Sequence, residues 1–453
     1  MAPVIYPYRY YLYDLIDYPV KNPLFRKLSD APDSSTKFYG QAMSGKAVTD
    51  DDRSTEPHEA EFSFYEFFAG GGMARAGLGK QWRCLFANDM DPIKASTYID
   101  NWGDEHFDIR DVREITPNDL PRHADLTWAS FPCQDLSLAG NGLGIGERDS
   151  SADEITRSGA VWPFLNLISN LSEENRKPPI LVLENVLGLL TLDQGRHFAA
   201  ICHQLSKTGY RYGAIIVDAK HFLPQSRPRV FIVAISRHIS IPAYIVSKEP
   251  LPEWHSSSLL RACDALSEEV HDDWVWWSPG IMPEAKMKEL TDIIDCEDTN
   301  ALWHSADETQ RLIRMMAPAN RARLAKAQES GETMIGSLYL RMRKEKSVNQ
   351  QRAEITFSTV LGCLRTPKGG ASRPRIIVVN GNQVKTRLLS VKEAAALMGL
   401  PDDFILPAAY QSAFKVIGDG LAIPSVRFLA ERILEPLAMA VRNNTHRTED
   451  IRE

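Results

Sequence analysis

The chain has 453 residues and a formal net charge of −7; 43% of its residues are hydrophobic and 25% are charged. This length suggests two or three domains, and the composition is that of an ordinary globular protein rather than a strongly basic nucleic-acid coat. The sequence has no run of about 18 or more apolar residues and no apolar signal segment, so we expect a cytoplasmic protein without a membrane span. Its six cysteines form no Cys-x-x-Cys motif, which argues against a metal site.

Residues 1–60 are first rich in Tyr and Pro and then polar and acidic, which indicates a flexible N-terminal extension. From residue 61 on, short apolar runs alternate with helical stretches. The runs lie at 62–68, 84–87, 126–130, 180–183, 214–217 and 230–235. This alternation predicts βαβ units, and therefore an α/β domain with a largely parallel sheet.

The first apolar run leads into a glycine-rich turn, residues 68–72. Glycine permits positive φ angles and lets the backbone approach a ligand closely. Asp89 follows the next run, where an acid suits a ribose diol, and Asp111 follows a further apolar stretch. The spacing is not that of a dinucleotide site and no P-loop lysine follows, which leaves a nucleoside-type cofactor such as S-adenosylmethionine. The alternative is a simple tight turn.

The run 126–130 is followed by Pro132, Cys133 and Gln134. A cysteine just past such a strand lies where open α/β sheets build their active sites. No histidine flanks Cys133, so a hydrolase dyad is poorly supported. A thiol that adds to a ring carbon fits better, with Glu184, at the end of a later strand, as the acid that makes the ring electrophilic. The alternatives are a small buried cysteine and a carboxylate at a helix start.

The region from 237 to 385 lacks the strand–helix rhythm. Between Arg311 and Arg352 it has ten basic and three acidic residues, a net +7 in a chain that is acidic overall. Such asymmetry is typical of a surface that binds a phosphate backbone, although a solvated helical face has the same pattern. A helix with a capping box resumes at Ser390 and Glu393. We predict one domain of residues 61–238 plus 405–453 and a second of residues 239–404.

The order and spacing of these motifs resemble the DNA (cytosine-5)-methyltransferases of bacteria and phages. The matching segments are FFAGGG with residues 68–72 at its core, NDMD (88–91), SFPCQDLSLAG (130–140), LENV (183–186), QSRPR (225–229), RLLSVKEAAALMGLPDDF (387–404) and IGDGLAIPSV (417–426). The resemblance implies a Rossmann-like methyltransferase sheet that binds S-adenosyl-L-methionine, and a smaller target-recognition domain.

The resemblance also implies roles for individual residues. Cys133 would attack C6 of a cytosine flipped out of duplex DNA, Glu184 would hold its N3 edge, and Arg229 with Arg227 would orient the base. The residues expected to contact the cofactor are Phe68, Ala69, Gly70, Gly71, Gly72, Asp89, Met90, Asp111, Val112, Pro132 and Asp419. Those expected to contact DNA are Gln134, Ser137, Gln225, Arg341, Arg343, Lys344 and Lys346. Residues 135–157 are expected to form a mobile loop that closes over the DNA.

The expected partners are double-stranded DNA, on which the protein would act as a monomer, and a cognate restriction endonuclease. The chain departs from the family pattern at Asp419, where Asn is usual, at Glu66, where Asp is usual, and at Met90, where an aromatic residue often covers the adenine. One alternative is a tRNA cytosine-C5 methyltransferase, although its Cys-Phe-Thr signature is absent. Another is a catalytically silent DNA-binding module, which would not need Cys133 and Glu184 together.

Overall fold

The computed structural model describes residues 60–121, 123–133, 136, 157–283, 288–296, 301–345, 348–367 and 372–450. The predicted N-terminal extension and most of the loop 135–157 lie outside the described residues, as do Gln134, Ser137 and Lys346. Within the described part of the chain, no helix is long and apolar enough to cross a membrane.

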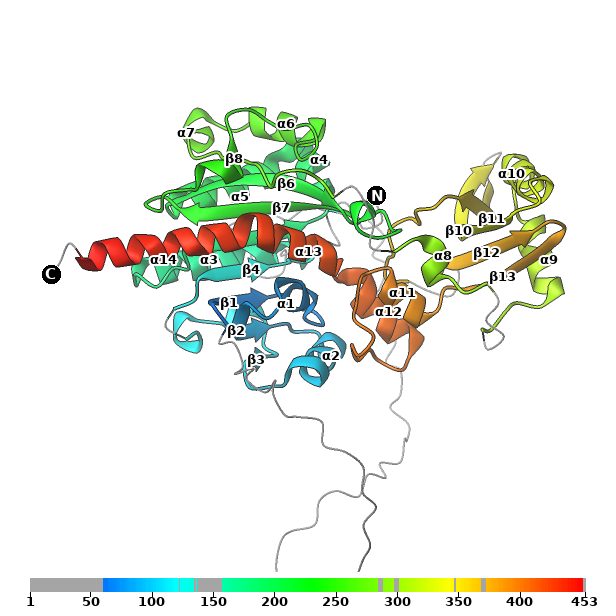
Figure 1. Cartoon of the computed structure of the whole chain (residues 1–453), viewed down its shortest axis with the longest axis horizontal. Helices are drawn as coiled ribbons and strands as arrows, with labels where there is room; N and C mark the ends of the chain where they lie inside the picture. Colours follow the sequence, from blue (N-terminus) through cyan, green and yellow to red (C-terminus); the bar gives the residue numbers. More distant parts are fainter. Residues whose placement is uncertain are drawn as a thin grey trace, which may run out of the picture. The chain divides into compact units, whose positions relative to one another are not determined.

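A seven-stranded sheet with the order β3-β2-β1-β4-β5-β7-β6 carries the candidate site (Figure 1). Its strands are β1 (Phe62–Phe67), β2 (Trp82–Asn88), β3 (Phe107–Asp108), β4 (Leu126–Ala129), β5 (Ile180–Asn185), β6 (Tyr210–Asp218) and β7 (Pro228–Ser236). Strands β1 to β5 are parallel, whereas β7 runs antiparallel to both β5 and β6. All six predicted strands are confirmed, and so is the α/β class. Because β7 is reversed, its first residues lie at the same edge of the sheet as the last residues of β4 and β5.

Helices cover both faces of this sheet. They are α1 (Met73–Leu78), α2 (Pro92–Trp102), α3 (Val161–Glu173), α4 (Gly188–Thr191), α5 (Arg196–Lys207), α12 (Tyr410–Asp419), α13 (Ile423–Leu429) and α14 (Glu435–Asp450). Successive strand residues point to opposite faces. Phe64 and Trp128 belong to the core cluster of α1, α12, α13 and α14, whereas Phe67 and Leu183 belong to the cluster of α3 and α5. Burial on both faces explains why these strands are continuous apolar runs.

A second, four-stranded antiparallel sheet has the order β11-β10-β12-β13. It consists of β10 (Thr333–Glu345), β11 (Val348–Phe357), β12 (Arg375–Asn380) and β13 (Gln383–Leu388), with helices α9 (Ala306–Arg314) and α10 (Pro318–Glu329). On one face, Leu338 and Ile377 pack with Leu324 of α10 in a separate small core. On the other face, Ile376 and Val378 join the core of the seven-stranded sheet. The small sheet is therefore packed against the rest of the chain through these residues of β12.

The segment between the two sheets packs on the larger one. It forms β8 (Val246–Ser247), α6 (Ser257–Asp264), α7 (Glu268–His271), β9 (Trp276–Trp277) and α8 (Leu290–Ile293). The indole of Trp277 donates a 3.1 Å hydrogen bond to the carbonyl of Val233 in β7, and the amide of Tyr212 donates to Asp273 at 2.9 Å. Residues 239–277 thus lie along β6 and β7.

The C-terminal segment returns to the larger sheet. It begins with α11 (Val391–Ala396), whose predicted capping box is confirmed: the hydroxyl of Ser390 accepts from the amide of Glu393, and the Glu393 carboxylate accepts from the amide of Ser390. Helix α13 then lies directly on α1, since a Cβ at Gly77 would be 2.4 Å from Cβ of Val426. This return brings residues near 420 to the glycine-rich turn.

Candidate active site

The predicted nucleophile, Cys133, lies four residues beyond the end of β4 and is half-buried. The Asn185 side chain at the end of β5 donates a 3.0 Å hydrogen bond to the carbonyl of Phe131, which fixes the backbone just before the cysteine. Burial raises the pKa of the Cys133 thiol above its ordinary value, and the positive charge of Arg229 opposes that rise. The thiol is therefore mainly protonated near neutral pH, and Arg229 is the group that favours its thiolate form.

Glu184 and Arg229 form an ion pair at the same sheet edge. Nε of Arg229 lies 3.1 Å from Oε1 of Glu184, and both side chains are largely buried. Burial raises the pKa of the Glu184 carboxyl, while Arg229 and Arg227 lower it. The edge thus brings together a thiol, a carboxyl group that keeps its proton to higher pH than an exposed one, and a guanidinium group.

Arg227 is only 2% exposed and makes most of its contacts with the protein backbone. Its two terminal nitrogens donate to the carbonyls of Leu364 at 2.9 Å, Gly418 at 2.8 Å and Gly420 at 2.5 Å. These bonds tie the start of β7 to the segment after β11 and to the end of α12. The structure therefore places Arg227 behind the site, where it can hold Arg229 in position.

Gln225 is completely buried, so it does not lie on a DNA-accessible surface. Its amide nitrogen donates to the carbonyl of Leu397 at 2.6 Å, and its amide oxygen accepts from the amide of Leu364 at 3.1 Å. We expected a DNA contact from this residue; its burial indicates a structural role instead, because both ends of its amide are satisfied within the protein.

The glycine-rich turn between β1 and α1 has a strained backbone. Phe68 has a φ of +56°, a conformation that is rare for an aromatic residue and is often found at functional sites. Gly70 also has positive φ, and a Cβ placed there would meet nothing within 4 Å, so this side of the turn is open. In contrast, a Cβ at Gly72 would lie 2.2 Å from the indole nitrogen of Trp102. The turn is packed from behind and open in front, as a ligand-binding turn requires.

The residues predicted around the nucleoside lie beside this turn. The buried carboxylate of Asp89 accepts 2.9 Å hydrogen bonds from the amides of Gly70 and Asp91, and thus joins the ends of β1 and β2. Met90, next in the chain, is 62% exposed, an apolar side chain available to a planar ring. Val112 is buried, and the Asp111 carboxylate pairs with Arg113 at 2.7 Å. Asp89 and Met90 are therefore better placed for a ligand than Val112.

Two residues that the sequence did not single out complete the site. Lys94 of α2 lies 3.0 Å from the carboxylate of Asp419, whose other oxygen accepts a 2.7 Å hydrogen bond from Thr366. The Sγ atom of Cys363 lies 3.3 Å from a terminal nitrogen of Arg227, and Arg227 and Arg229 together lower the Cys363 pKa despite its burial. Nothing in the spacing of the sequence links these residues, because their partners lie far away along the chain.

The profile of the family described as C-5 cytosine-specific DNA methylase matches residues 62–435, which is most of the chain. The chain belongs to this family. It is 27% identical over 387 residues to the Type II methyltransferase M.HaeII of Haemophilus aegyptius, covering 84% of this chain and 96% of that protein. It is 33% identical over 387 residues to M.BsuFI of Bacillus subtilis, covering 84% of this chain and 74% of that protein.

The fold of this methylase is similar to that of solved relatives. The Dnmt2 methyltransferase of S. pombe matches with a TM-score of 0.50 at 17% identity, covering 83% of this chain and 99% of that one. This likeness confirms the α/β fold, and the family match confirms the assignment as a DNA (cytosine-5-)-methyltransferase.

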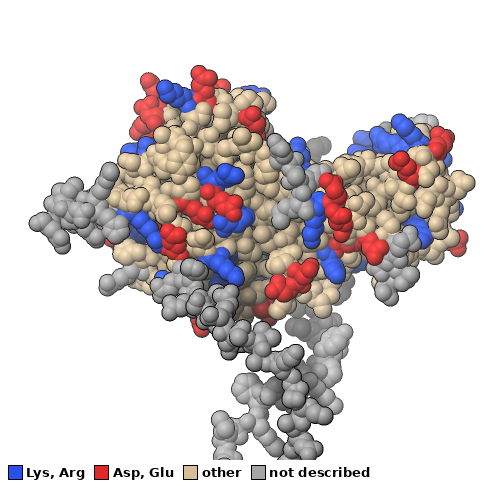
Figure 2. Space-filling view, in the orientation of Figure 1, with Lys and Arg blue, Asp and Glu red and all other residues tan. Residues whose placement is uncertain are grey.

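Three of the basic residues predicted to contact DNA, Arg341, Arg343 and Lys344, lie on the four-stranded sheet of the methylase. Arg341 and Arg343 alternate with apolar residues along β10 and share one face, whereas Lys344 points to the other. Both arginines are exposed, and both are near Glu354 of β11. Lys and Arg side chains gather at the end of the sheet near α10 and β11 (Figure 2).

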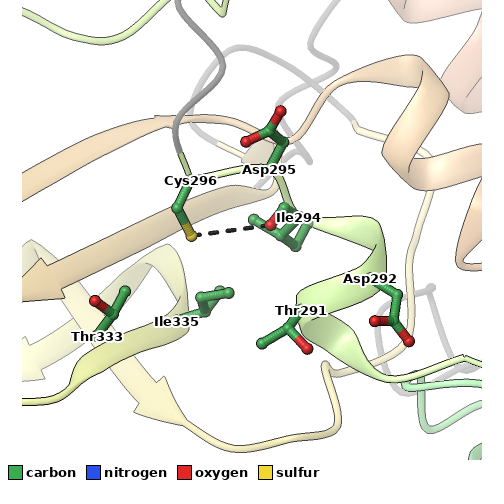
Figure 3. A pocket seen from close by; sticks show the side chains of 7 residues that line it. All are labelled: Thr291, Asp292, Ile294, Asp295, Cys296, Thr333 and Ile335. Atoms are coloured by element: carbon green, nitrogen blue, oxygen red, sulfur yellow. Dashed lines mark hydrogen bonds between the residues drawn. The ribbon is translucent and has the colours of Figure 1, made fainter.

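A cavity of about 440 Å³ lies between α8 and the start of β10 (Figure 3). It is lined by Thr291, Asp292, Ile294, Asp295, Cys296, Thr333 and Ile335. None of the residues predicted for catalysis, cofactor binding or DNA binding lines this cavity.

Proposed function

We propose that this methylase transfers a methyl group from S-adenosyl-L-methionine to C5 of a specific cytosine in duplex DNA, through a covalent bond between Cys133 and C6 of the base. The observation that supports this most is the position of Arg229, which pairs with Glu184 at 3.1 Å and acts electrostatically on Cys133. One guanidinium group thus connects the proposed nucleophile and the proposed acid.

In this reaction the Cys133 thiolate forms a bond to C6, and the electron pair of the C5–C6 double bond moves toward C5 and the N3 edge of the ring. Glu184, whose pKa is raised by burial, donates a hydrogen bond or a proton to N3 and so stabilises that charge. Methylation of C5 would release S-adenosylhomocysteine. Loss of the C5 proton to water would then restore the C5–C6 double bond and expel Cys133 as a thiolate. Covalent addition divides a difficult substitution on an unactivated carbon into easier steps.

The residues around the glycine-rich turn fit an adenosine-containing cofactor. S-adenosyl-L-methionine, when bound, supplies an electrophilic methyl group on its sulfonium. The open side of Gly70 accommodates close backbone contact, Asp89 has further lone pairs for a ribose diol, and exposed Met90 provides an apolar surface for the adenine. In this proposal, Lys94 balances the charge that Asp419 adds to the site.

The proposed reaction requires the target base to leave the DNA stack, because C6 is inaccessible inside a duplex. The four-stranded sheet would read the sequence. The similarity to Type II methyltransferases supports a role beside a restriction endonuclease. We also propose that the enzyme acts as a monomer on DNA.

Transfer of a labelled methyl group from the cofactor to plasmid DNA, with tRNA as the alternative substrate, tests this function. We expect incorporation as 5-methylcytosine in DNA and none in tRNA. Cys133→Ala should abolish transfer, while binding of S-adenosylhomocysteine is kept. DNA with 5-fluorocytosine at the target should trap a denaturant-resistant adduct, since the fluorine cannot leave; an active enzyme that forms no adduct would refute the covalent route.

A further inference from the structure

The end of β10 and the end of β11 form a two-stranded ribbon. Residues 336–338 of β10 pair with both β11 and β12, whereas residues 339–345 pair only with β11. The ribbon therefore extends beyond the part of the sheet that packs on the methylase core. A two-stranded ribbon has dimensions that fit the major groove of B-DNA.

One face of this ribbon is continuous with the active site. Tyr339 lies on the same face as Arg341 and Arg343, and its hydroxyl is 3.4 Å from the Cβ position of Gly362. The next residue, Cys363, contacts Arg227. Neighbouring residues thus connect Arg227 with the ribbon. Arg343 lies four residues, or about 13 Å, farther along β10 than Tyr339.

Arg343 is held on this face by a two-point contact. Its Nε and Nη2 atoms donate to the two oxygens of Glu354 at 2.5 and 2.8 Å. Glu354 also lies 3.5 Å from Arg341, but without that fork geometry. Because Glu354 occupies the Nε edge of the Arg343 guanidinium, the hydrogens on Nη1 and the second hydrogen on Nη2 point away from the carboxylate. This outer edge has the spacing of the O6 and N7 acceptors of guanine.

We propose that Arg343 reads a guanine in the recognition sequence through this outer edge, and that Glu354 is the positioning residue that presents it. The inference rests on the proposed DNA methylation, and it adds the base, the reading residue and the residue that orients it. A fixed guanidinium loses less rotamer freedom on binding and favours one orientation, as base discrimination requires. The hydrogen bonds from Arg343 also lower the pKa of Glu354, so the carboxylate remains charged and continues to accept both bonds from Arg343.

The test measures base preference in two ways. Bisulfite sequencing of hosts that express the wild type, Arg343→Gln, Glu354→Gln and Lys344→Gln gives the methylated consensus. Selection of duplexes from a random pool, with every protein also carrying Cys133→Ala, gives the bound consensus without methylation. Lys344→Gln is the matched control, since it removes one positive charge from the neighbouring position on the opposite face.

We expect Arg343→Gln to reduce discrimination at one guanine by about tenfold or more, the size of one lost bidentate contact, and the other positions to keep their preference. Glu354→Gln should weaken discrimination at that same guanine. Lys344→Gln removes a charge that is itself expected to contact DNA, so it should lower the affinity for every sequence by a similar factor and leave the consensus unchanged. A uniform loss of affinity in Arg343→Gln, with an unchanged consensus and a shallower salt dependence, would identify a phosphate contact and overturn the inference.

The two proposals fail separately. If the wild type methylates DNA but the guanine preference survives Arg343→Gln, base reading by Arg343 is wrong and the methylation stands. If no cytosine is methylated but the selected duplexes show a guanine that depends on Arg343, the proposed reaction is wrong and the reading role stands. Absence of both methylation and guanine preference would overturn both.

Discussion

The ammonium group of Lys94 lies 3.0 Å from the carboxylate of Asp419, and this ion pair joins α2 to the end of α12. In the DNA (cytosine-5)-methyltransferases, the position of Asp419 usually carries an uncharged Asn. The extra negative charge is balanced here by a lysine that lies beside Asp89 and Asp91 as well. The departure from the family pattern is therefore accompanied by a compensating residue in the fold.

Lys94→Met should weaken binding of S-adenosylhomocysteine, because it leaves Asp419 and Asp89 without a nearby cation beside the cofactor turn. We expect a loss of about 1 kcal/mol, since the pair is partly exposed. Adding Asp419→Asn should restore part of the affinity, because no charge then needs a partner. Isothermal titration calorimetry measures both, and unchanged affinity in Lys94→Met would contradict the role given to the pair.

Arg227→Met should mainly lower the stability of the fold and should have a smaller effect on binding of the base. The substitution leaves the carbonyls of Leu364 and Gly418 without their donor in the interior, so we expect a loss of about 3 kcal/mol or more in the free energy of unfolding. Urea denaturation measures this change. A loss below about 1 kcal/mol would show that Arg227 does not hold these segments together.

Arg229→Met should slow alkylation of Cys133 by iodoacetamide at any given pH. Arg229 lowers the pKa of this thiol, so its removal reduces the thiolate fraction and moves the rise in reactivity to higher pH. Peptide mass spectrometry distinguishes Cys133 from the other cysteines. Methyl transfer should also fall, by about 100-fold, and a variant with faster alkylation would contradict the electrostatic role of Arg229.

Glu66→Gln should change how stability depends on pH. Burial raises the pKa of Glu66 in the folded protein to about 8, whereas an unfolded chain has the ordinary lower value. The folded state therefore binds more protons between these two values, and the stability contributed by neutral Glu66 is lost as pH rises through this window. Denaturant titrations at about pH 5 and pH 8 should show a smaller loss in Glu66→Gln than in the wild type. Equal losses would contradict a protonated Glu66.

Alanine at Gly70 and at Gly72 should have different effects. Both glycines have positive φ, so each substitution carries a strain of about 1 kcal/mol or more. At Gly72 the new Cβ would also meet the Trp102 ring at 2.2 Å, whereas at Gly70 it would enter open space. Thermal unfolding should show the larger destabilisation for Gly72→Ala. Gly70→Ala should mainly weaken cofactor binding, and an equal loss of stability in both variants would refute this distinction.

The alternation of apolar runs was sufficient to predict the strands, since each contributes buried side chains to the cores on both faces of the sheet and must be apolar on both. The capping box at Ser390 was equally predictable, because its two hydrogen bonds join residues three apart. In contrast, the reversed direction of β7 was not predicted. It depends on pairing with β5 and β6, and this pairing places Arg229 beside Glu184.

The family, the apolar strands and the order of the motifs could be predicted from the sequence, because they depend on local patterns along the chain. The burial of Gln225, the contacts of Arg227 with backbone carbonyls and the contact of Arg343 with Glu354 became apparent only in the folded structure. The physical reason is that the residue type fixes the charge and hydrogen-bonding capacity of a side chain. Its partner depends on which distant segments come together when the chain folds.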